Sequence, residues 1–522
     1  MSTDVSTDTT GNVETGNVDG VPAPAPTARA GRRAQGNSLV FLASAAVLVL
    51  EIVAMRLVAP YVGVTLQTSS AVIGTALAAM ALGAWAGGRL ADRTDPGRLL
   101  GPVLVVGGVL TMLTAPVVRL VGTWLAEREL SSVPAVLLLA LLAVFLPAAA
   151  LSTVTPMVVK LELSTLDRTG SVVGRLSGVA TLGAIVATFL TGFVLLAHLR
   201  TSVILLGTGG LLVLAGGWLL VRRPQRLAIA VTLLALPVVP GAFAVSPNPC
   251  QVETDYHCAS VVEDPPGSTG RALHLDTLTH GYVDLDDPQA LAFEYVQAMA
   301  DVTDVVRAPG TALDGLFIGG GAFSLPRYLA ATRPGSRSRV LEIDRGVVAL
   351  GRRQLGADEI PRMDVLVGDG RTGVAAEAAA RYDLVYGDAF GGLAVPWHLT
   401  TREAVRDIRQ VLRPDGIYVL NVIDFAPDAF ARAEIATLRS VFPHLAVAAD
   451  NATLRGIVGG NHVLIASASP LPLTRIAERL RTTTPGWKLL DEDATAAFAG
   501  AARPLTDDLA PVDQLLTTHL AS

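Results

Sequence analysis

The chain has 522 residues, of which 51% are hydrophobic and only 16% are charged, and its formal net charge is −6. Soluble domains carry roughly 25% charged residues, and the deficit here is concentrated before residue 247. The acidic balance and the lack of a long Lys/Arg run argue against nucleic-acid binding, and the length suits two or three domains.

The first 36 residues form a polar tail that is rich in Ser, Thr, Asp, Gly and Pro. Nothing in this tail can bury a hydrophobic core, so we expect residues 1–36 to be disordered. The tail ends in Arg29, Arg32 and Arg33, directly before the first apolar stretch.

Seven apolar stretches fill residues 37–246. Each is close to the ~20 residues that a helix needs to cross a bilayer, and the first is too long for a cleaved signal peptide. We therefore predict an α-helical transmembrane bundle of about seven spans in the cell membrane, with the lipid bilayer as its partner. The stretches lie near 38–60, 69–91, 99–121, 133–157, 173–197, 201–221 and 227–246.

Basic residues flank alternate loops of this bundle. Besides the three arginines of the tail, one set of loops carries Arg89, Arg93, Arg98, Lys160, Arg168, Arg175, Arg222, Arg223 and Arg226. The opposite loops carry only Arg119, Arg128 and Arg200. The positive-inside rule places the N-terminus in the cytoplasm. An odd number of spans then makes the domain after residue 246 extracytoplasmic.

Two charged residues lie within the first span, Glu51 and Arg56. Charge inside a membrane is costly and points to function by default. For Glu51 we consider a transport or ligand role and, alternatively, a buried hydrogen bond between helices. Arg56 is able to extend to the interface. Residues 88–98 resemble the cytoplasmic loop between helices two and three of major-facilitator transporters.

The only two cysteines, Cys250 and Cys258, follow the last apolar stretch. Such a pair can form a disulfide, half of a metal site, or two unrelated thiols. No further Cys or Cys/His cluster completes a zinc site, so we predict no metal. The expected location outside the cytoplasm favours a Cys250–Cys258 disulfide.

Residues 247–522 have the pattern of a folded α/β domain. Alternation over 256–263 and 271–284 predicts an N-terminal β-hairpin layer. The strand–helix repeats from 314 onward predict a Rossmann-like, methyltransferase-type doubly wound sheet. Its expected strands are 316–318, 340–343, 364–367, 384–386 and 417–422, with a helix at 401–412 and an added antiparallel edge strand at 461–466.

Glycines or a carboxylate follow each of the first four strands of this sheet. The glycine turn is 319–321, and the carboxylates are Glu342, Asp369 and Asp388. Ligands of open α/β sheets bind outside the carboxyl ends of the strands, and a carboxylate after the second strand can accept both ribose hydroxyls. A glycine turn brings backbone amides close to a ligand. The set predicts a nucleoside site.

These segments resemble the spermidine synthase (polyamine aminopropyltransferase) family, and more closely its membrane-fused branch. The resemblance covers about 252–470 and includes Phe-Ile-Gly-Gly-Gly at 317–321 and Leu-Glu-Ile-Asp at 341–344. The other matching segments are 256–257, 275–276, 280–282, 293–295, 368–371, 382–388, 398–403 and 412–416.

The resemblance implies a polyamine-biosynthesis transferase that moves an aminopropyl group from decarboxylated S-adenosylmethionine to an amine acceptor. It implies Asp388 as the general base, and Tyr282 and Tyr295 as substrate-binding residues. It also implies a small-molecule amine or nucleoside as ligand, and a homodimer as in many family members. The implied cofactor-binding residues are His257, Gly319, Gly320, Gly321, Glu342, Asp369 and Gly370.

The chain departs from the family on the amine side. Ala322 and Gly391 stand where the family has Asp, and 295–298 reads Tyr-Val-Gln-Ala instead of Tyr-His-Glu-Met. Two further interpretations therefore remain. One is an S-adenosylmethionine-dependent, methyltransferase-type enzyme, and the other is a non-catalytic nucleoside- or polyamine-sensing domain on a transporter-like bundle.

Overall fold

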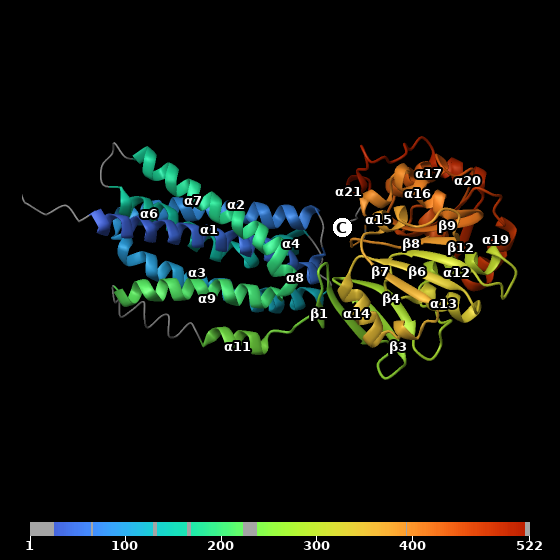
Figure 1. Cartoon of the computed structure of the whole chain (residues 1–522), viewed down its shortest axis with the longest axis horizontal. Coiled ribbons are helices and arrows are strands. Elements are labelled where there is room, and N and C mark those ends of the chain that lie inside the picture. The colour runs from blue at the N-terminus through green and yellow to red at the C-terminus, as the bar shows by residue number, and fades with distance from the viewer. Residues whose placement is uncertain are drawn as a thin grey trace, which may run out of the picture.

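The computed structural model describes residues 26–63, 66–128, 133–163, 169–222, 237–392 and 394–516. A bundle of long helices and an α/β domain lie end to end along the longest axis of the molecule (Figure 1). The first helix, α1 (Pro26–Val62), begins within the predicted tail. The prediction of disorder is therefore wrong for 26–36, where Ala, Arg and Gln are good helix formers that extend the apolar helix backward.

The first six predicted spans are confirmed as helical stretches that are long and apolar enough to cross a membrane. The fourth and the fifth each contain a short π-helical turn. After α1 the elements are α2 (Leu66–Arg93), α3 (Pro96–Ala126), α4 (Val133–Ala140), η1 (Leu141–Phe145), α5 (Leu146–Ser152), α6 (Val154–Glu162), α7 (Thr169–Leu190), η3 (Thr191–Leu195), α8 (Leu196–His198) and α9 (Thr201–Arg222).

The first half of the seventh predicted span, 227–236, lies outside the described residues. Its described part contains α11 (Val238–Val245), an eight-residue helix. Val239 of α11 packs in one apolar cluster with Val105 and Val109 of α3 and Leu220 of α9. This part of the chain therefore lies against the bundle just before the α/β domain begins.

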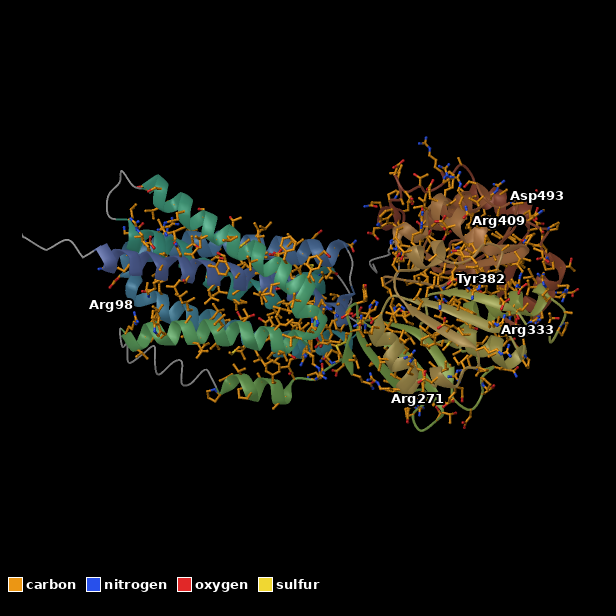
Figure 2. All side chains as sticks on the ribbon, viewed as in Figure 1. Arg98, Arg271, Arg333, Tyr382, Arg409 and Asp493 are labelled. Atoms are coloured by element: carbon orange, nitrogen blue, oxygen red, sulfur yellow. A yellow bond between two sulfur atoms is a disulfide. The ribbon has the colours of Figure 1, made fainter. Side chains whose placement is uncertain are left out.

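The two ends of the bundle have different neighbours. At one end, Arg56 of α1 contacts the α/β domain, and so does Thr201 at the start of α9. At the other end, Arg175 near the start of α7 bonds to Asn37 of α1, and Arg98 lies at this far end as well (Figure 2). α9 begins beside the α/β domain and runs away from it, and the α/β domain lies at the end of the bundle opposite the start of α1 (Figure 1).

The α/β domain begins with a four-stranded antiparallel sheet in which neighbouring strands are consecutive in sequence. This confirms the β-hairpin layer. The Cys250–Cys258 disulfide is also confirmed, with 5.0 Å between the two Cα atoms. The strands are β1 (Val252–Glu253), β2 (Cys258–Glu263), β3 (Gly270–Leu275) and β4 (Leu278–Asp284).

The main sheet has eight strands in the order β12-β10-β11-β9-β8-β5-β6-β7. The strands β9, β8, β5, β6 and β7 are parallel, and β11 runs antiparallel to β9. The expected edge strand at 461–466 is therefore antiparallel but internal, because β10 and β12 extend the sheet beyond it. The bounds are β5 (Asp314–Ile318), β6 (Arg337–Glu342), β7 (Met363–Val367), β8 (Tyr382–Gly387), β9 (Leu412–Asp424), β10 (His444–Asp450), β11 (Gly460–Ser467) and β12 (Trp487–Leu490).

Helices cover both faces of this sheet, which confirms a doubly wound fold. One face packs on α12 (Glu294–Val306), α13 (Ser324–Thr332) and α19 (Leu473–Thr483). The other packs on α15 (Gly370–Ala375), α16 (Arg402–Val411), α17 (Ala429–Arg439), α20 (Glu492–Ala499) and α21 (Val512–Leu515). The small sheet packs on α14 (Arg345–Gln354). The short elements are η4 (Ala357–Glu359), η5 (Trp397–Leu399) and α18 (Asn451–Leu454).

Candidate active site

The carboxyl end of β5 lies between the ends of β6 and β8, where the chain reverses the direction of strand addition. The backbone N–H of Gly319 donates to the carbonyl of Leu341 (2.9 Å), and that of Asp388 donates to the carbonyl of Ile318 (2.9 Å). Gly319 has a φ of +98°, and a Cβ on it would lie 2.3 Å from the carbonyl oxygen of Asp388. Only glycine therefore fits this turn, which brings the predicted base next to the glycine motif.

Glu342 ends β6 with its carboxylate held against this turn. Its Oε2 accepts from the N–H of Gly320 (2.7 Å), and its Oε1 accepts from the N–H of Asp344 (2.8 Å). Burial raises the pKa of Glu342, while these backbone donors oppose the rise. Each oxygen keeps a second lone pair, so the carboxylate can still accept from a vicinal diol.

A cavity of about 660 Å³ opens beside these strand ends. Most of the predicted site residues line it, namely His257, Tyr295, Gly319, Gly320, Gly321, Glu342 and Asp388. Four acidic residues are among those that line it, Glu294, Glu342, Asp388 and Asp450. Among the described residues that line the cavity, none is Lys or Arg. The cavity is therefore strongly suited to positively charged ligands.

Asp388 lies at the centre of a small polar network. Its Oδ1 accepts from Asn421 Nδ2 (2.9 Å), and its Oδ2 lies 3.4 Å from the hydroxyl of Tyr295. Asn461 Nδ2 in turn donates to Asn421 Oδ1 (3.0 Å). Burial raises the pKa of Asp388 to about 6, and the two hydrogen bonds oppose this rise. A carboxylate with this pKa is well matched to accept a proton near neutral pH.

His257 forms a wall of the cavity and is itself oriented by Asp276. His257 Nδ1 lies 2.8 Å from Asp276 Oδ2, and the N–H of Cys258 donates to Asp276 Oδ1 (3.0 Å). A carboxylate at Nδ1 keeps the proton on that nitrogen, so Nε2 remains available to a ligand. Nearby, burial lowers the pKa of His280 to about 4, so that ring is neutral at physiological pH.

Three predicted site residues lie outside the cavity wall. Asp369 caps α15 by accepting from the N–H of Thr372 (3.0 Å), and its other oxygen bonds to His398 Nε2 (2.9 Å). Gly370 follows it at the start of α15. The ring of Tyr282 lies over Gly270, where a Cβ would meet its hydroxyl at 2.3 Å. Asp369 and Gly370 therefore follow the end of β7 without lining the cavity, and the Tyr282 ring packs on the small sheet.

A curated relative of the chain supports the first of the interpretations of this site. The polyamine aminopropyltransferase of Vibrio vulnificus (strain CMCP6) is 29% identical over 215 residues, which cover 38% of this chain and 69% of that protein. The α/β domain is spermidine synthase-like. The chain is accordingly an aminopropyltransferase-like enzyme of the transferase class.

The chain is also similar to two solved structures. A probable spermidine synthase from Corynebacterium glutamicum ATCC 13032 matches 51% of this chain and 99% of its own, with 27% identity and a TM-score of 0.47. The spermidine synthase from Thermotoga maritima matches 47% of this chain and 81% of its own, with 19% identity and a TM-score of 0.34. No family model matches the chain.

The spermidine synthase-like cavity also contains polar residues that we did not predict. Asn421 and Asn461 come from the neighbouring strands β9 and β11, and Asp450 and Trp487 come from the ends of β10 and β12. The signal for Asn421 was present in the sequence, because it is the only polar residue in the run 417–423 apart from a tyrosine. Asn461, Asp450 and Trp487 could be placed at the cavity only from the strand order of the sheet, which local sequence patterns do not give.

The amine side of this aminopropyltransferase-like site lacks two carboxylates, because Ala322 and Gly391 stand at the two positions where the resemblance implies Asp. Ala322 is buried against Gly281, where a Cβ would lie 2.5 Å from the Ala322 methyl group, so position 281 requires glycine. Gly391 pairs with Ala394 in an isolated bridge. The remaining acidic groups at this end are Asp388, Glu294 and Asp450.

Proposed function

We propose that the chain is a membrane-anchored aminopropyltransferase that uses decarboxylated S-adenosylmethionine and an amine acceptor. The observation that supports this most is the charge of the cavity, which has four carboxylates and no Lys or Arg among its described lining residues. An intact S-adenosylmethionine carries a carboxylate that would find no cationic side chain there. The decarboxylated donor is purely cationic, and so is a protonated amine acceptor.

In this proposal the nucleoside is held at the ends of β5 and β6. Glu342 accepts the ribose hydroxyls with its free lone pairs, and the 319–321 turn allows the donor to approach the backbone. We assign the adenine to the rim formed by Asp369 and Gly370, with His257 on the opposite side. The reactive carbon then points toward Asp388.

Asp388 removes a proton from the bound ammonium, which frees the nitrogen lone pair. The amine nitrogen attacks the propyl carbon next to sulfur, so a C–N bond forms as the C–S bond breaks. The electron pair of the broken bond stays on sulfur, which turns the sulfonium into the neutral thioether of methylthioadenosine. The proton ends on Asp388 and leaves to water.

A methyltransferase-type reaction is the second candidate, and the residues Ala322 and Gly391 favour it. Without two amine-side carboxylates the site has less charge to hold an aminopropyl nitrogen. Such an enzyme would take intact S-adenosylmethionine and release S-adenosylhomocysteine.

Calorimetry with the full chain in lipid nanodiscs separates these candidates. We expect methylthioadenosine and decarboxylated S-adenosylmethionine to bind about 10-fold or more tightly than S-adenosylmethionine, because one unpaired carboxylate near buried acidic groups costs more than 1.4 kcal/mol. We also expect methylthioadenosine as product with a diamine acceptor. Tighter binding of S-adenosylmethionine with release of S-adenosylhomocysteine would establish the second candidate. No binding of any nucleoside would refute both enzymes and leave a polyamine-sensing domain.

Membrane anchoring is supported by three Arg–Trp pairs at the ends of apolar helices. The guanidinium of Arg89 lies 3.8 Å from the Trp85 ring centre, and that of Arg222 lies 3.8 Å from Trp218. These pairs lie at the far end of the bundle, whereas Arg128 stacks on Trp124 (4.4 Å) at the end near the α/β domain. Exposed tryptophans at both ends of long apolar helices are typical of the two bilayer interfaces.

Reporter fusions test the orientation that the positive-inside rule predicts. Alkaline phosphatase fused after Ser522 should be active, because it folds only outside the cytoplasm, whereas the same reporter fused after Arg222 should be inactive. A cytoplasmic fluorescent protein should give the reverse pattern at both sites. An inactive phosphatase after Ser522, with fluorescence in its place, would refute the extracytoplasmic location of the α/β domain.

A further inference from the structure

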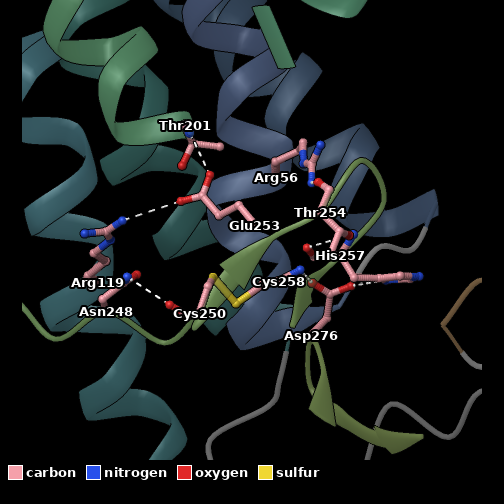
Figure 3. The surroundings of a disulfide bond; sticks show 10 residues. All are labelled: Arg56, Arg119, Thr201, Asn248, Cys250, Glu253, Thr254, His257, Cys258 and Asp276. Atoms are coloured by element: carbon pink, nitrogen blue, oxygen red, sulfur yellow. Dashed lines mark hydrogen bonds and ion pairs between the residues drawn. A yellow bond between two sulfur atoms is a disulfide. The ribbon is translucent and has the colours of Figure 1, made fainter. Parts of the chain in front are cut away.

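Residues 250–258, which we call the junction segment, attach the α/β domain to three different helices of the bundle (Figure 3). Arg56 of α1 donates to the carbonyl of Asp255 (2.9 Å) and, more closely, to that of Thr254. Glu253 accepts from the N–H of Thr201 at the start of α9 (2.6 Å) and lies 3.8 Å from Arg119 of α3. The Cys250–Cys258 disulfide closes the segment on itself.

Thr254 is the point at which the junction segment meets the nucleoside side of the cavity. Only 6% of this residue is exposed. Its hydroxyl accepts from the backbone N–H of His257 (2.8 Å) and donates to Asp344 Oδ2. Its methyl group packs on the first turn of α14, where a Cβ on Gly346 would lie 2.4 Å from Thr254 Cγ2. The Thr254 side chain thus contacts both the His257 segment and the start of α14, which follows Glu342.

Asp344 is bonded in turn to Glu342. Its Oδ1 caps α14 by accepting from the N–H of Gly346 (2.8 Å), and its own N–H donates to Glu342 Oε1 (2.8 Å). Only 1% of Asp344 is exposed, so it has no water to replace a lost partner. Arg56 in the first apolar helix is therefore connected to the carboxylate of Glu342 through hydrogen bonds of Thr254 and Asp344.

We propose that Thr254 is a positioning residue that fixes His257 relative to Glu342, and that Arg56 holds Thr254 in place from the bundle. The bundle is then part of the nucleoside site and not only an anchor. This inference rests on the proposed nucleoside site, and it goes beyond it by assigning a role to residues that touch no ligand.

Two matched substitutions at Thr254 test the proposal on the full chain in nanodiscs. Thr254→Val keeps the shape and removes the hydroxyl, and we expect it to raise the Kd of methylthioadenosine about 10-fold or more, because a buried carboxylate and a buried N–H lose their partner. The KM for the donor should rise similarly while kcat changes less than about twofold, because Asp388 is not touched. Thr254→Ser, which keeps the hydroxyl, should restore the Kd to within about threefold of the wild type.

Thr483→Val is the matched control, because Thr483 donates to the buried Asp301 between α19 and α12, away from the cavity. It should lower the thermal stability without changing the Kd.

Arg56→Met should raise the Kd, as Thr254→Val does. A wild-type Kd for Thr254→Val, or a Thr254→Ser variant as weak as Thr254→Val, would overturn the positioning role. An unchanged Kd for Arg56→Met would overturn the proposal that the bundle contributes to the nucleoside site. A wild type that binds no nucleoside would instead refute the proposed function and this inference with it.

Discussion

Asp388→Asn is expected to lower kcat by about 1,000-fold, within the range by which a positioned general base accelerates proton transfer. The amide has nearly the same shape. Its oxygen can still accept from Asn421, and its NH₂ can donate to the hydroxyl oxygen of Tyr295, so the cavity keeps its form. The Kd of methylthioadenosine should stay within about threefold of the wild type, because this product carries no ammonium. Steady-state rates and calorimetry on the same preparations measure both quantities.

The pH dependence of the wild type should report the same carboxyl. The pKa of Asp388 is raised to about 6, so kcat should fall about tenfold for each pH unit below that value, as the base becomes protonated. Above pH 6 the profile should level off. An unchanged kcat in Asp388→Asn would remove this residue as the base.

The stabilities of the wild type and of Asp388→Asn should diverge as pH rises. A carboxyl with a raised pKa binds protons more readily in the folded state, so its contribution to stability is full below the unfolded value near 4 and is lost as pH rises through about 6. Asp388→Asn removes this loss and should stabilise the fold by about 1–3 kcal/mol at pH 8, after allowance for water in the open cavity. The difference should vanish near pH 4.

Asp383→Asn is the matched control for Asp388. Asp383 lies on the same strand but outside the cavity, where it bonds to Arg307 (3.1 Å) and Arg413. Its substitution should leave kcat unchanged and lower the stability instead, because two guanidinium groups lose their partner. Equal losses of kcat in Asp388→Asn and Asp383→Asn would show that the loss comes from disturbance of β8 and not from removal of the base.

The sheet and the strand-end motifs could be predicted because their signals are local. A short apolar run followed by Gly or an acidic residue is visible within a few positions, and parallel pairing then aligns the ends. Glu342 and Asp388 were found in this way, and each ends its strand as expected. The π-helical turns of the bundle and the early start of α1 were not predicted, because hydropathy marks apolar length and not helix limits.

The residues that connect distant parts of the chain could not be predicted from local patterns. Arg56 was interpreted as reaching the membrane interface, yet its partners are carbonyls some 200 positions later in the sequence. Asn461 reaches Asn421 only because β11 is inserted beside β9. Such contacts depend on strand order and domain docking, which no single segment encodes.

Glu342→Gln is expected to raise the Kd of methylthioadenosine about 100-fold, because charge-assisted hydrogen bonds to both ribose hydroxyls are lost. The amide cannot replace the carboxylate at this position. Gly320 and Asp344 each donate an N–H to a different oxygen of Glu342, and an amide NH₂ would face one of these donors. The substitution should therefore disturb the glycine turn as well as the ribose contact, and kcat/KM should fall with the affinity.

Glu377→Gln provides the control for a buried glutamate in the same domain. Glu377 bonds to Arg339 Nε (3.0 Å) and Arg381 (2.7 Å), and none of the three lines the cavity. Its loss should lower the melting temperature but leave the Kd of methylthioadenosine unchanged. Glu342→Gln with wild-type affinity would show that the ribose is held elsewhere, and the adenosyl end of the donor would then have to be assigned to the Asp369 rim alone.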